Sequence, residues 1–366
     1  MDIKLPGHSL RQTALLTAIL TLAACGGGGS DTAPVVSGPQ PDPWAPVISE
    51  LETSSLDNLV LIVGTAEGEQ FRYEKGQFGI DTVYPIASAS KWLTGATILQ
   101  LVQQGVMALD DRPQDYLDYW SSDPNDARSR ITLEMLLSFT AGFHIAPLDP
   151  NCTGDEQLTV QACAAAFYAD GVDAEPGTTF YYGPAHMQVA AAMAEVATGQ
   201  SWRDVVELTI AAPLNLANTG FEGDNPKASG GANSTTNEYA EFIRAQLRGD
   251  LLPAGLLQLT AERTAALGLM SRPAAVEGAT RDWQYGLGVW RECNRPEWDA
   301  VCEAATLVSS AGAFGWYPWL DVDRGYYAVL GRNASIGFGR NPAADSVNLG
   351  ARLQPLIQNA LSVASP

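Results

Sequence analysis

Two groups of apolar runs, near the two ends of the chain, predict the strands of a buried sheet. Residues 59–65 (LVLIVGT) are rich in β-branched side chains, and the alternating residues 70–73 follow after a turn at 66–69. This pattern is typical of a hairpin in a well-buried sheet. Further strands are predicted late in the chain, at 286–291, 306–310 and 326–331.

Apolar residues with helical spacing occupy the middle of the chain. Residues 88–104 have a mostly apolar stripe that includes Lys91, and only a narrow edge of this segment is polar, which predicts a mostly buried helix. Residues 105–220 are mainly helical in pattern, including 133–137 and 187–198. Strands at both ends with helices between them predict an α/β layer with an inserted helical region.

The first 24 residues have the pattern of a signal peptide. Lys4 and Arg11 precede the uncharged apolar run 13–24, which is shorter than the roughly 20 apolar residues that span a bilayer. The run ends in Leu22-Ala23-Ala24-Cys25, which resembles the lipobox of bacterial lipoproteins, where the cysteine is acylated and becomes the new N-terminus. An ordinary signal peptide followed by a free Cys25 is the alternative.

Residues 25–47 are expected to form a flexible tether that carries the lipid. They are mostly Gly, Pro, Ser and Asp and have little apolar surface to bury. Two or three acyl chains on Cys25 would hold such a protein stably on a membrane. We therefore expect an exported, membrane-anchored bacterial lipoprotein. Gly26 after the cysteine favours the outer membrane, or a periplasm-facing position, by the sorting pattern of such proteins.

The remaining residues, 48–366, are expected to form the folded domain. Their number exceeds the ~250 residues at which a single core usually stops growing, so two subdomains are expected. The pattern places an α/β part at about 48–87 and 225–366, and a helical part at about 88–224.

Four cysteines in the predicted domain are expected to form disulfides, because an even number of cysteines in an exported protein is typical of disulfides. Of the three possible connectivities, we favour Cys152–Cys163 and Cys293–Cys302, since each pair lies within one short polar loop. Buried free thiols are the alternative.

Charge and composition exclude two classes of protein. The net charge is −20 and the chain has only four lysines, so it lacks the basic clusters of a nucleic-acid-binding protein. A zinc site is disfavoured, because no CxxC pattern occurs and only His144 and His186 follow the predicted cleavage site. No metal or cofactor is expected.

Lys91 is unusual because it lies on the apolar stripe of the predicted helix. Burial of a lysine lowers its pKa, so that the neutral amine becomes available as a base. Ser88 lies three residues earlier, and this spacing brings the two side chains together at the start of the helix. The N–H groups and dipole at a helix start favour negative charge on the serine oxygen. Ser88 and Lys91 are therefore candidates for a nucleophile and its base.

A purely structural interpretation of these residues is the alternative. In it, Ser88 or Ser90 only caps the helix, and Lys91 extends to water. The S-x-x-K pattern is weak by itself, but it occurs once in this chain and uses one of four lysines in an otherwise apolar setting. This favours the catalytic interpretation.

The segment 83–91 (VYPIASASK) resembles the nucleophile segment of the β-lactamase-related serine hydrolases, a family of class C β-lactamases, D,D-peptidases and family VIII carboxylesterases. The likeness runs from about residue 60 to 332, and Phe139 stands where the family usually has histidine. Further landmarks follow in the family's order, at 109–117, 131–142 (ITLEMLLSFTAG), 176–182 (PGTTFYY) and 285–288 (YGLG). The resemblance implies an α+β, β-lactamase/transpeptidase-like fold, with an antiparallel sheet flanked by helices and an inserted, mainly helical subdomain.

The resemblance also implies roles for residues outside the nucleophile segment. Tyr182 matches the tyrosine that relays the proton beside the Ser–Lys pair, with the neighbouring Tyr181 as its rival. Ser310-Ala311-Gly312 lies at the place of the family's K-T-G. Gly312 would let the substrate approach the strand closely, and the N–H groups of Ala313 and Ser88 would form the oxyanion hole.

Two departures from the family pattern bear on the substrate. The family's Tyr-x-Asn becomes Tyr182-Gly183-Pro184, and the lysine of K-T-G becomes Ser310, which removes an amide and a cation that would hold a β-lactam or peptide. An aromatic run follows on the same strand. We expect substrate contacts from Ser310, Gly312 and members of this run, namely Phe314 and Trp316 before Tyr317 and Trp319. The changes favour an ester with an apolar group.

A Ser-His-Asp hydrolase is a competing mechanism. It is disfavoured because the chain has no G-x-S-x-G segment and few histidines. His186 is expected to begin the helix after Tyr182 as a partly buried structural residue, and a hydrogen bond from it to the site is the alternative.

The sequence therefore predicts a serine hydrolase that works through an acyl-enzyme, most simply a carboxylesterase acting on a small-molecule ester. The alternatives are a β-lactamase, or a D,D-peptidase or amidase, on the same Ser-Lys-Tyr machinery. A non-catalytic envelope lipoprotein that keeps the fold is a third possibility.

Overall fold

The computed structural model describes residues 42–143, 152–253, 255–267, 269–271, 276, 283–293, 295, 298–337 and 339–364. The predicted signal peptide, Cys25, residues 25–41 of the predicted tether and His144 lie outside the described residues. The first helix, α1 (Ala45–Thr53), begins inside the segment predicted as tether. Its proline lies in the first turn, where a helix tolerates it, and Val47 and Leu51 are buried.

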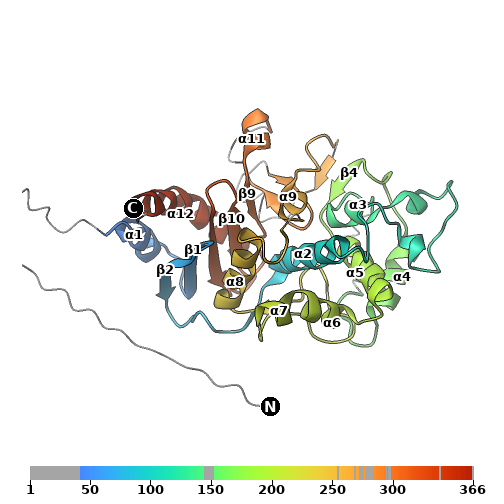
Figure 1. Ribbon diagram of the computed structural model, residues 1–366, viewed down its shortest axis with the longest axis horizontal. Helices are drawn as coiled ribbons and strands as arrows, with labels where there is room; N and C mark the ends of the chain where they lie inside the picture. Colours follow the sequence, from blue (N-terminus) through green and yellow to red (C-terminus); the bar gives the residue numbers. More distant parts are fainter. Residues whose placement is uncertain are drawn as a thin grey trace, which may run out of the picture. The chain divides into compact units, whose positions relative to one another are not determined.

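A seven-stranded antiparallel sheet has the strand order β2-β1-β11-β10-β9-β8-β7. Figure 1 shows the N-terminal hairpin beside strands from the end of the chain. β1 is buried along nearly its whole length, which explains its continuous apolar sequence. The strands are β1 (Leu59–Thr65), β2 (Gly68–Lys75), β7 (Gln284–Tyr285), β8 (Trp290–Arg291), β9 (Leu307–Ser309), β10 (Tyr317–Asp321) and β11 (Tyr326–Arg332).

Two small strand pairs lie outside this sheet. β3 (Tyr84–Pro85) pairs antiparallel with β5 (Asn233–Ser234), and β4 (Thr179–Tyr181) pairs parallel with β6 (Leu269–Ser271). The first pair brings the segment before Ser88 next to a loop that is more than a hundred residues away in the chain.

Most α-helices in the described residues are short. The α-helices after α1 are α2 (Ser90–Gln103), α3 (Leu133–Leu137), α4 (Val160–Asp170), α5 (Ala185–Thr198), α6 (Trp202–Val206), α7 (Ala212–Leu214), α8 (Thr236–Leu247), α9 (Gly255–Thr260), α11 (Ala300–Ala304) and α12 (Pro342–Ala364). Of these, α2, α4, α5, α8 and α12 are the longer ones. The other helical turns are the 3₁₀ segments η1 (Ala87–Ala89), η2 (Pro113–Asp115) and η3 (Ala127–Arg130) and the π-helical η4 (Glu207–Ala211). Within the described ranges, no helix is both long enough and apolar enough to cross a bilayer.

Helices α8 and α12 cover opposite faces of the sheet. Gly331 of β11 lies against the side chain of Thr236 in α8. Its neighbour Leu330 points to the other face, because side chains alternate along a strand. Leu330 pairs with Tyr317 of β10, whose ring lies against Gly350 of α12. The glycines at these two contacts let each helix approach the sheet closely.

The sequence predictions for the sheet are mostly confirmed, with two differences. The aromatic run was expected to continue the strand of 306–310, but its last part forms a separate strand, β10, that pairs antiparallel with β9. The other difference is at 286–291. The structure has a hairpin there instead of one strand, with β7 and β8 joined by a turn. Gly288 has φ +94°, a conformation that favours glycine, and its Cα lies against the Lys91 carbonyl of α2. Gly95 of α2 in turn lies against the Leu287 carbonyl. Small residues on both sides therefore allow this turn to pack directly on the helix that carries Lys91.

Both predicted disulfides are present. Cys152 is linked to Cys163 and Cys293 to Cys302, with Cα atoms 5.4 Å and 5.3 Å apart. Each bridge closes a short loop, as the sequence spacing indicated. Disulfides are typical of proteins in an oxidising compartment.

Candidate active site

The predicted nucleophile lies on a tight turn that leads into α2. Ser88 is the middle residue of η1, and Ala87 has φ +46°, a conformation that is costly for a residue with a Cβ. Ser90 holds this turn, because its hydroxyl donates to the Ala87 carbonyl at 2.6 Å and accepts from the Ala232 N–H at 3.0 Å. The N-cap residue of α2 is Ala89, so Ser88 does not cap the helix.

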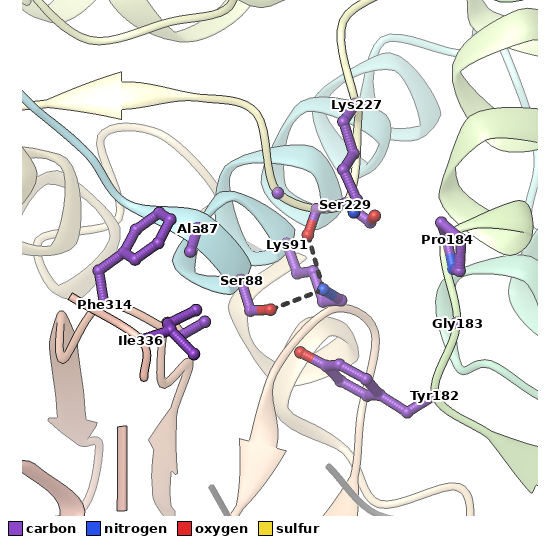
Figure 2. A pocket seen from close by; sticks show the side chains of 12 residues that line it. Ala87, Ser88, Lys91, Tyr182, Gly183, Pro184, Lys227, Ser229, Phe314 and Ile336 are labelled. Carbon is purple, nitrogen blue, oxygen red and sulfur yellow. Dashed lines mark hydrogen bonds between the residues drawn. The ribbon is translucent and has the colours of Figure 1, made fainter. Parts of the chain in front are cut away.

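Lys91 is buried beside Ser88. The residue is only 4% exposed, and its Nζ lies 3.1 Å from the Ser88 Oγ. The Nζ also donates to the Ser229 carbonyl at 2.6 Å, and Figure 2 shows both contacts. The amine is therefore held between the serine hydroxyl and a backbone carbonyl that lies far away in the chain.

The surroundings of Lys91 favour its neutral form. Burial, and secondarily the positive charge of Lys227, lower the pKa of Lys91 well below its usual value of 10.5. Among the described residues no carboxylate pairs with this amine. A neutral amine has a lone pair that can take the proton of Ser88.

Tyr182 completes the group. Figure 2 shows its phenol oxygen turned toward the Ser88 hydroxyl and the Lys91 amine. The Nζ of Lys91 lies 4.4 Å from the centre of the Tyr182 ring. The ring stacks between Phe139 (5.2 Å, 16°) and Trp290 (5.5 Å, 18°). Burial raises the pKa of Tyr182, and hydrogen bonding with Ser88 opposes this only in part. The resting tyrosine is therefore a protonated phenol that can donate and relay a proton.

Phe139 takes the place of the family's usual histidine in a strained conformation. It is fully buried and has φ +59°. Its carbonyl accepts the Tyr181 N–H at 2.8 Å, so the turn is tied to the strand that precedes Tyr182. Tyr181, the rival candidate for the proton relay, ends β4 and is not among the residues that line the pocket.

The segment after β9 lies against the nucleophile turn. Ser310 Oγ donates to the Ser88 carbonyl at 3.0 Å, and Gly312 lies so close to the Ile86 carbonyl that a Cβ would overlap it. Ala313 and Phe314 line the pocket beside Ser88. Ser310 and Gly312 thus support the nucleophile turn from outside the pocket lining, a different position from the substrate contact predicted for them.

Trp316 is a correction to the predicted substrate site. It is completely buried, and its ring packs near Phe78 and Tyr239, with centroids 6.5 Å and 6.1 Å away. Of the aromatic run that follows the strand, Phe314 lines the pocket, whereas Trp316, Tyr317 and Trp319 are fully buried. These three rings fill the core, because this part of the sheet is covered on both faces and consecutive side chains are therefore all buried.

The pocket itself has a volume of about 390 Å³, within the range of sites for small molecules. Sequence reasoning missed several of its lining residues, of which Lys227 and Ile336 are the most distinctive. Lys227 is one of four lysines, but its local sequence has no spacing that indicates a site. The full lining is Ala87, Ser88, Lys91, Tyr182, Gly183, Pro184, Lys227, Ser229, Gly230, Ala313, Phe314 and Ile336.

His186 is not part of the cluster formed by Ser88, Lys91 and Tyr182. It lies in the first turn of α5, is buried, and packs against Phe139 and Phe143. Within the described structure neither ring nitrogen has a hydrogen-bond partner, and burial lowers the pKa of His186 to about 3. A neutral histidine behind the aromatic wall is not placed to activate Ser88.

The fold and the cluster of Ser88, Lys91 and Tyr182 agree with the serine hydrolase that the sequence predicted. The chain matches the family model described as Beta-lactamase over residues 59–347, and it belongs to that family of serine hydrolases.

Known proteins with related folds carry several activities. A protein of Bacteroides dorei DSM 17855 assigned as a beta-lactamase has a TM-score of 0.71 and 24% identity, over 86% of this chain and 98% of that one. EstCE1, a hydrolase with promiscuous acyltransferase activity, has a TM-score of 0.64 and 18% identity, over 82% and 96% of the two chains.

Sequence relatives match a shorter part of the chain. Penicillin-binding protein 4 of Amycolatopsis lactamdurans is 31% identical over 138 residues, which are 37% of this chain and 35% of that protein. The match spans about a third of the length of such curated relatives.

Proposed function

We propose that this protein hydrolyses carboxylic esters through a covalent acyl-enzyme on Ser88. The observation that carries the proposal is the buried Lys91 amine, 3.1 Å from the Ser88 hydroxyl and close to the phenol of Tyr182. A serine becomes a nucleophile when an adjacent neutral base can take its proton.

The reaction proceeds in two halves. Ser88 Oγ attacks the ester carbonyl while its proton passes to the Lys91 amine, directly or through the Tyr182 phenol. The tetrahedral intermediate then breaks its bond to the alkoxide, which leaves with the proton returned by Lys91 and Tyr182. Water attacks the acyl-enzyme in the same way and restores the Ser88 hydroxyl. The N–H groups of Ser88 and Ala313 are proposed to bind the oxyanion in both halves.

The pocket lining supports an ester over a β-lactam or a peptide amide. Gly183 and Pro184 have no side-chain amide to bind a peptide group, and Ser310 replaces the family's lysine. Phe314 and Ile336 form an apolar side, against which an acyl or alkyl group would be buried. EstCE1 shares the fold and is named as a hydrolase and acyltransferase, which agrees with this proposal.

Hydrolysis of β-lactams or of peptide amides is the second candidate, favoured by the sequence match to a penicillin-binding protein. Turnover of para-nitrophenyl butyrate and of a chromogenic cephalosporin would be compared on the same preparation, with Ser88→Ala as the control. We expect ester turnover that depends on Ser88 and exceeds cephalosporin turnover. Strong cephalosporin hydrolysis with weak ester cleavage would make β-lactam hydrolysis the favoured function and ester hydrolysis the second candidate.

A binding protein without catalysis is a different class of function. A fluorophosphonate probe should label the protein at Ser88, because labelling requires an activated serine. Absence of labelling on folded protein would favour the non-catalytic role.

We further propose that the protein is exported and anchored to the membrane by a lipid on Cys25. The two disulfides support an oxidising compartment. Mass spectrometry of the mature N-terminus would find an acylated Cys25 if this is right, and an unmodified N-terminus elsewhere if it is wrong.

A further inference from the structure

The pocket contains a cation that the family motifs do not explain. Lys227 lines the pocket together with Ser88, Lys91 and Tyr182, whereas the K-T-G position is taken by Ser310. None of the residues that line the pocket is acidic, although the whole chain has a net charge of −20. Burial lowers the pKa of Lys91, and its amine is engaged by Ser88 and the Ser229 carbonyl, so Lys227 is the lysine of the pocket that is available to a substrate.

The loop that carries Lys227 is held firmly. The Lys227 carbonyl accepts the N–H groups of Gly230 at 2.9 Å and Gly231 at 2.7 Å. The buried Gln188 of α5 donates to the carbonyl before Lys227, at Pro226 (3.1 Å), and accepts from the N–H after it, at Ala228 (3.1 Å). These hydrogen bonds fix the backbone from which the Lys227 side chain extends, which lowers the entropy cost of binding a ligand.

The stem of Lys227 runs across Gly230 beside the nucleophile turn. A Cβ placed on Gly230 would lie 3.7 Å from the Cδ and Cε atoms of Lys227, and 3.8 Å from the backbone carbon of Ala87. Figure 2 shows Lys227 on one side of Ser88, with Phe314 and Ile336 on the other. A substrate on Ser88 can therefore reach the lysine with one end and the apolar side with the other.

The ammonium of Lys227 has no counter-ion in the part of the chain that the structure describes. No carboxylate pairs with it there, and burial lowers its pKa without an acidic neighbour to oppose the change. A half-buried ammonium that lacks a partner is a good binding site for an anion, because a charge-assisted hydrogen bond gains strength where water is partly excluded.

We propose that Lys227 binds a carboxylate group of the substrate, so that the enzyme prefers esters that carry a carboxylate at one end and an apolar group at the other. This inference rests on the ester hydrolysis proposed above. It restores, from a different loop, the positive charge that is lost at Ser310. Lys227 is thus a specificity-determining residue.

The test compares esters of similar size that differ in one charge. On the acyl side, the pair is para-nitrophenyl hydrogen adipate and para-nitrophenyl hexanoate. On the alcohol side, the pair is meta-acetoxybenzoate and meta-acetoxybenzamide. We expect a higher kcat/KM for the charged member of at least one pair. Lys227→Met should lower the charged-to-neutral ratio about tenfold, mainly through KM, since a hydrogen bond to a charged group has about that effect.

Lys227→Arg is the matched variant, because it keeps the positive charge and should keep most of the ratio. The preference should also weaken as salt rises, since ions screen the attraction. Equal ratios in wild type, Lys227→Met and Lys227→Arg would overturn the inference, while hydrolysis of the neutral esters would leave the proposed function standing.

A binding measurement separates the two proposals further. Calorimetry on Ser88→Ala protein should show tighter binding of the charged member of the preferred pair, and Ser88→Ala/Lys227→Met protein should lose that difference. Wild-type protein that hydrolyses none of the four esters contradicts the proposed function. Ser88→Ala protein that binds charged and neutral members equally in both pairs contradicts the role of Lys227.

Discussion

The ring of Phe139 stacks on the ring of Tyr182, with 5.2 Å between the centroids and 16° between the planes. Phe139 therefore acts as one wall of the slot that orients the tyrosine, and Trp290 forms the other. A flat partner restricts rotation of the phenol, so that its oxygen stays directed at Ser88. This arrangement uses an aromatic side chain where the family usually has histidine.

We expect Phe139→Leu to lower kcat more than it changes KM. Leucine fills part of the space but offers no flat face, so Tyr182 would sample orientations away from Ser88. Loss of a buried ring also costs about 1–3 kcal/mol of stability. Thermal unfolding and ester kinetics would be measured on the same preparation. An unchanged kcat would show that the stacking does not orient the tyrosine.

Lys91→Met should remove nearly all turnover, about a thousandfold or more, and should also make the protein more stable. The pKa of Lys91 is lowered on folding, so at neutral pH the unfolded lysine binds a proton that the folded one must release. That cost is greatest at low pH and disappears as pH rises above the usual lysine pKa of 10.5. The gain from methionine should therefore shrink toward high pH in denaturant unfolding. Lys91→Arg, which keeps a charge but offers no base, should be inactive and less stable.

The pH dependence of kcat/KM should follow the titration of the Lys91 amine. The active form has a neutral Lys91, so activity is lost as pH falls through its lowered pKa and is retained well below pH 10.5. His186, whose pKa is lowered to about 3, does not contribute to this limb near neutrality. Replacing His186 with Gln should leave the midpoint of the profile in place, whereas a shifted midpoint would assign the limb to the histidine.

Tyr182→Phe should lower kcat by about 10²–10⁴-fold while the fold is kept. Phenylalanine preserves the stack between Phe139 and Trp290 but removes the hydroxyl that we propose relays the proton. Circular dichroism and thermal unfolding should match the wild type, which separates a chemical effect from a structural one. Tyr181→Phe is the matched control, and a larger loss from Tyr181 than from Tyr182 would contradict the assignment.

Gly312→Ala should impair the enzyme through the nucleophile turn. The new Cβ would overlap the Ile86 carbonyl, and overpacking of this kind costs about 1–3 kcal/mol. Because the turn positions Ser88, we expect kcat to fall at least about tenfold. Gly79→Ala is the control, since its Cβ would make ordinary contacts, with the Thr82 hydroxyl at 3.4 Å and a Glu74 carboxylate oxygen at 3.9 Å. Similar kinetics for both variants would mean that the contact at Gly312 is not important for catalysis.

The sequence was sufficient for features that depend on local periodicity. The apolar run of β1 predicted its strand, because a strand covered on both faces needs apolar residues throughout. Lys91 on an apolar stripe, three residues after Ser88, predicted the buried amine beside the hydroxyl, because helical geometry alone brings such residues together. The paired cysteines within short loops indicated the disulfides in the same way.

Tertiary structure alone decided the features that arise between distant segments. Trp316 is in the core and Phe314 in the pocket, although nothing in their order distinguishes them. Lys227 lines the same pocket as Ser88 because β3 pairs with β5 and the loop before β5 is bound to α2 and α5. Periodicity describes which side of one element is buried, but a pocket is made where elements meet. The position of a side chain in it therefore depends on packing that no single segment contains.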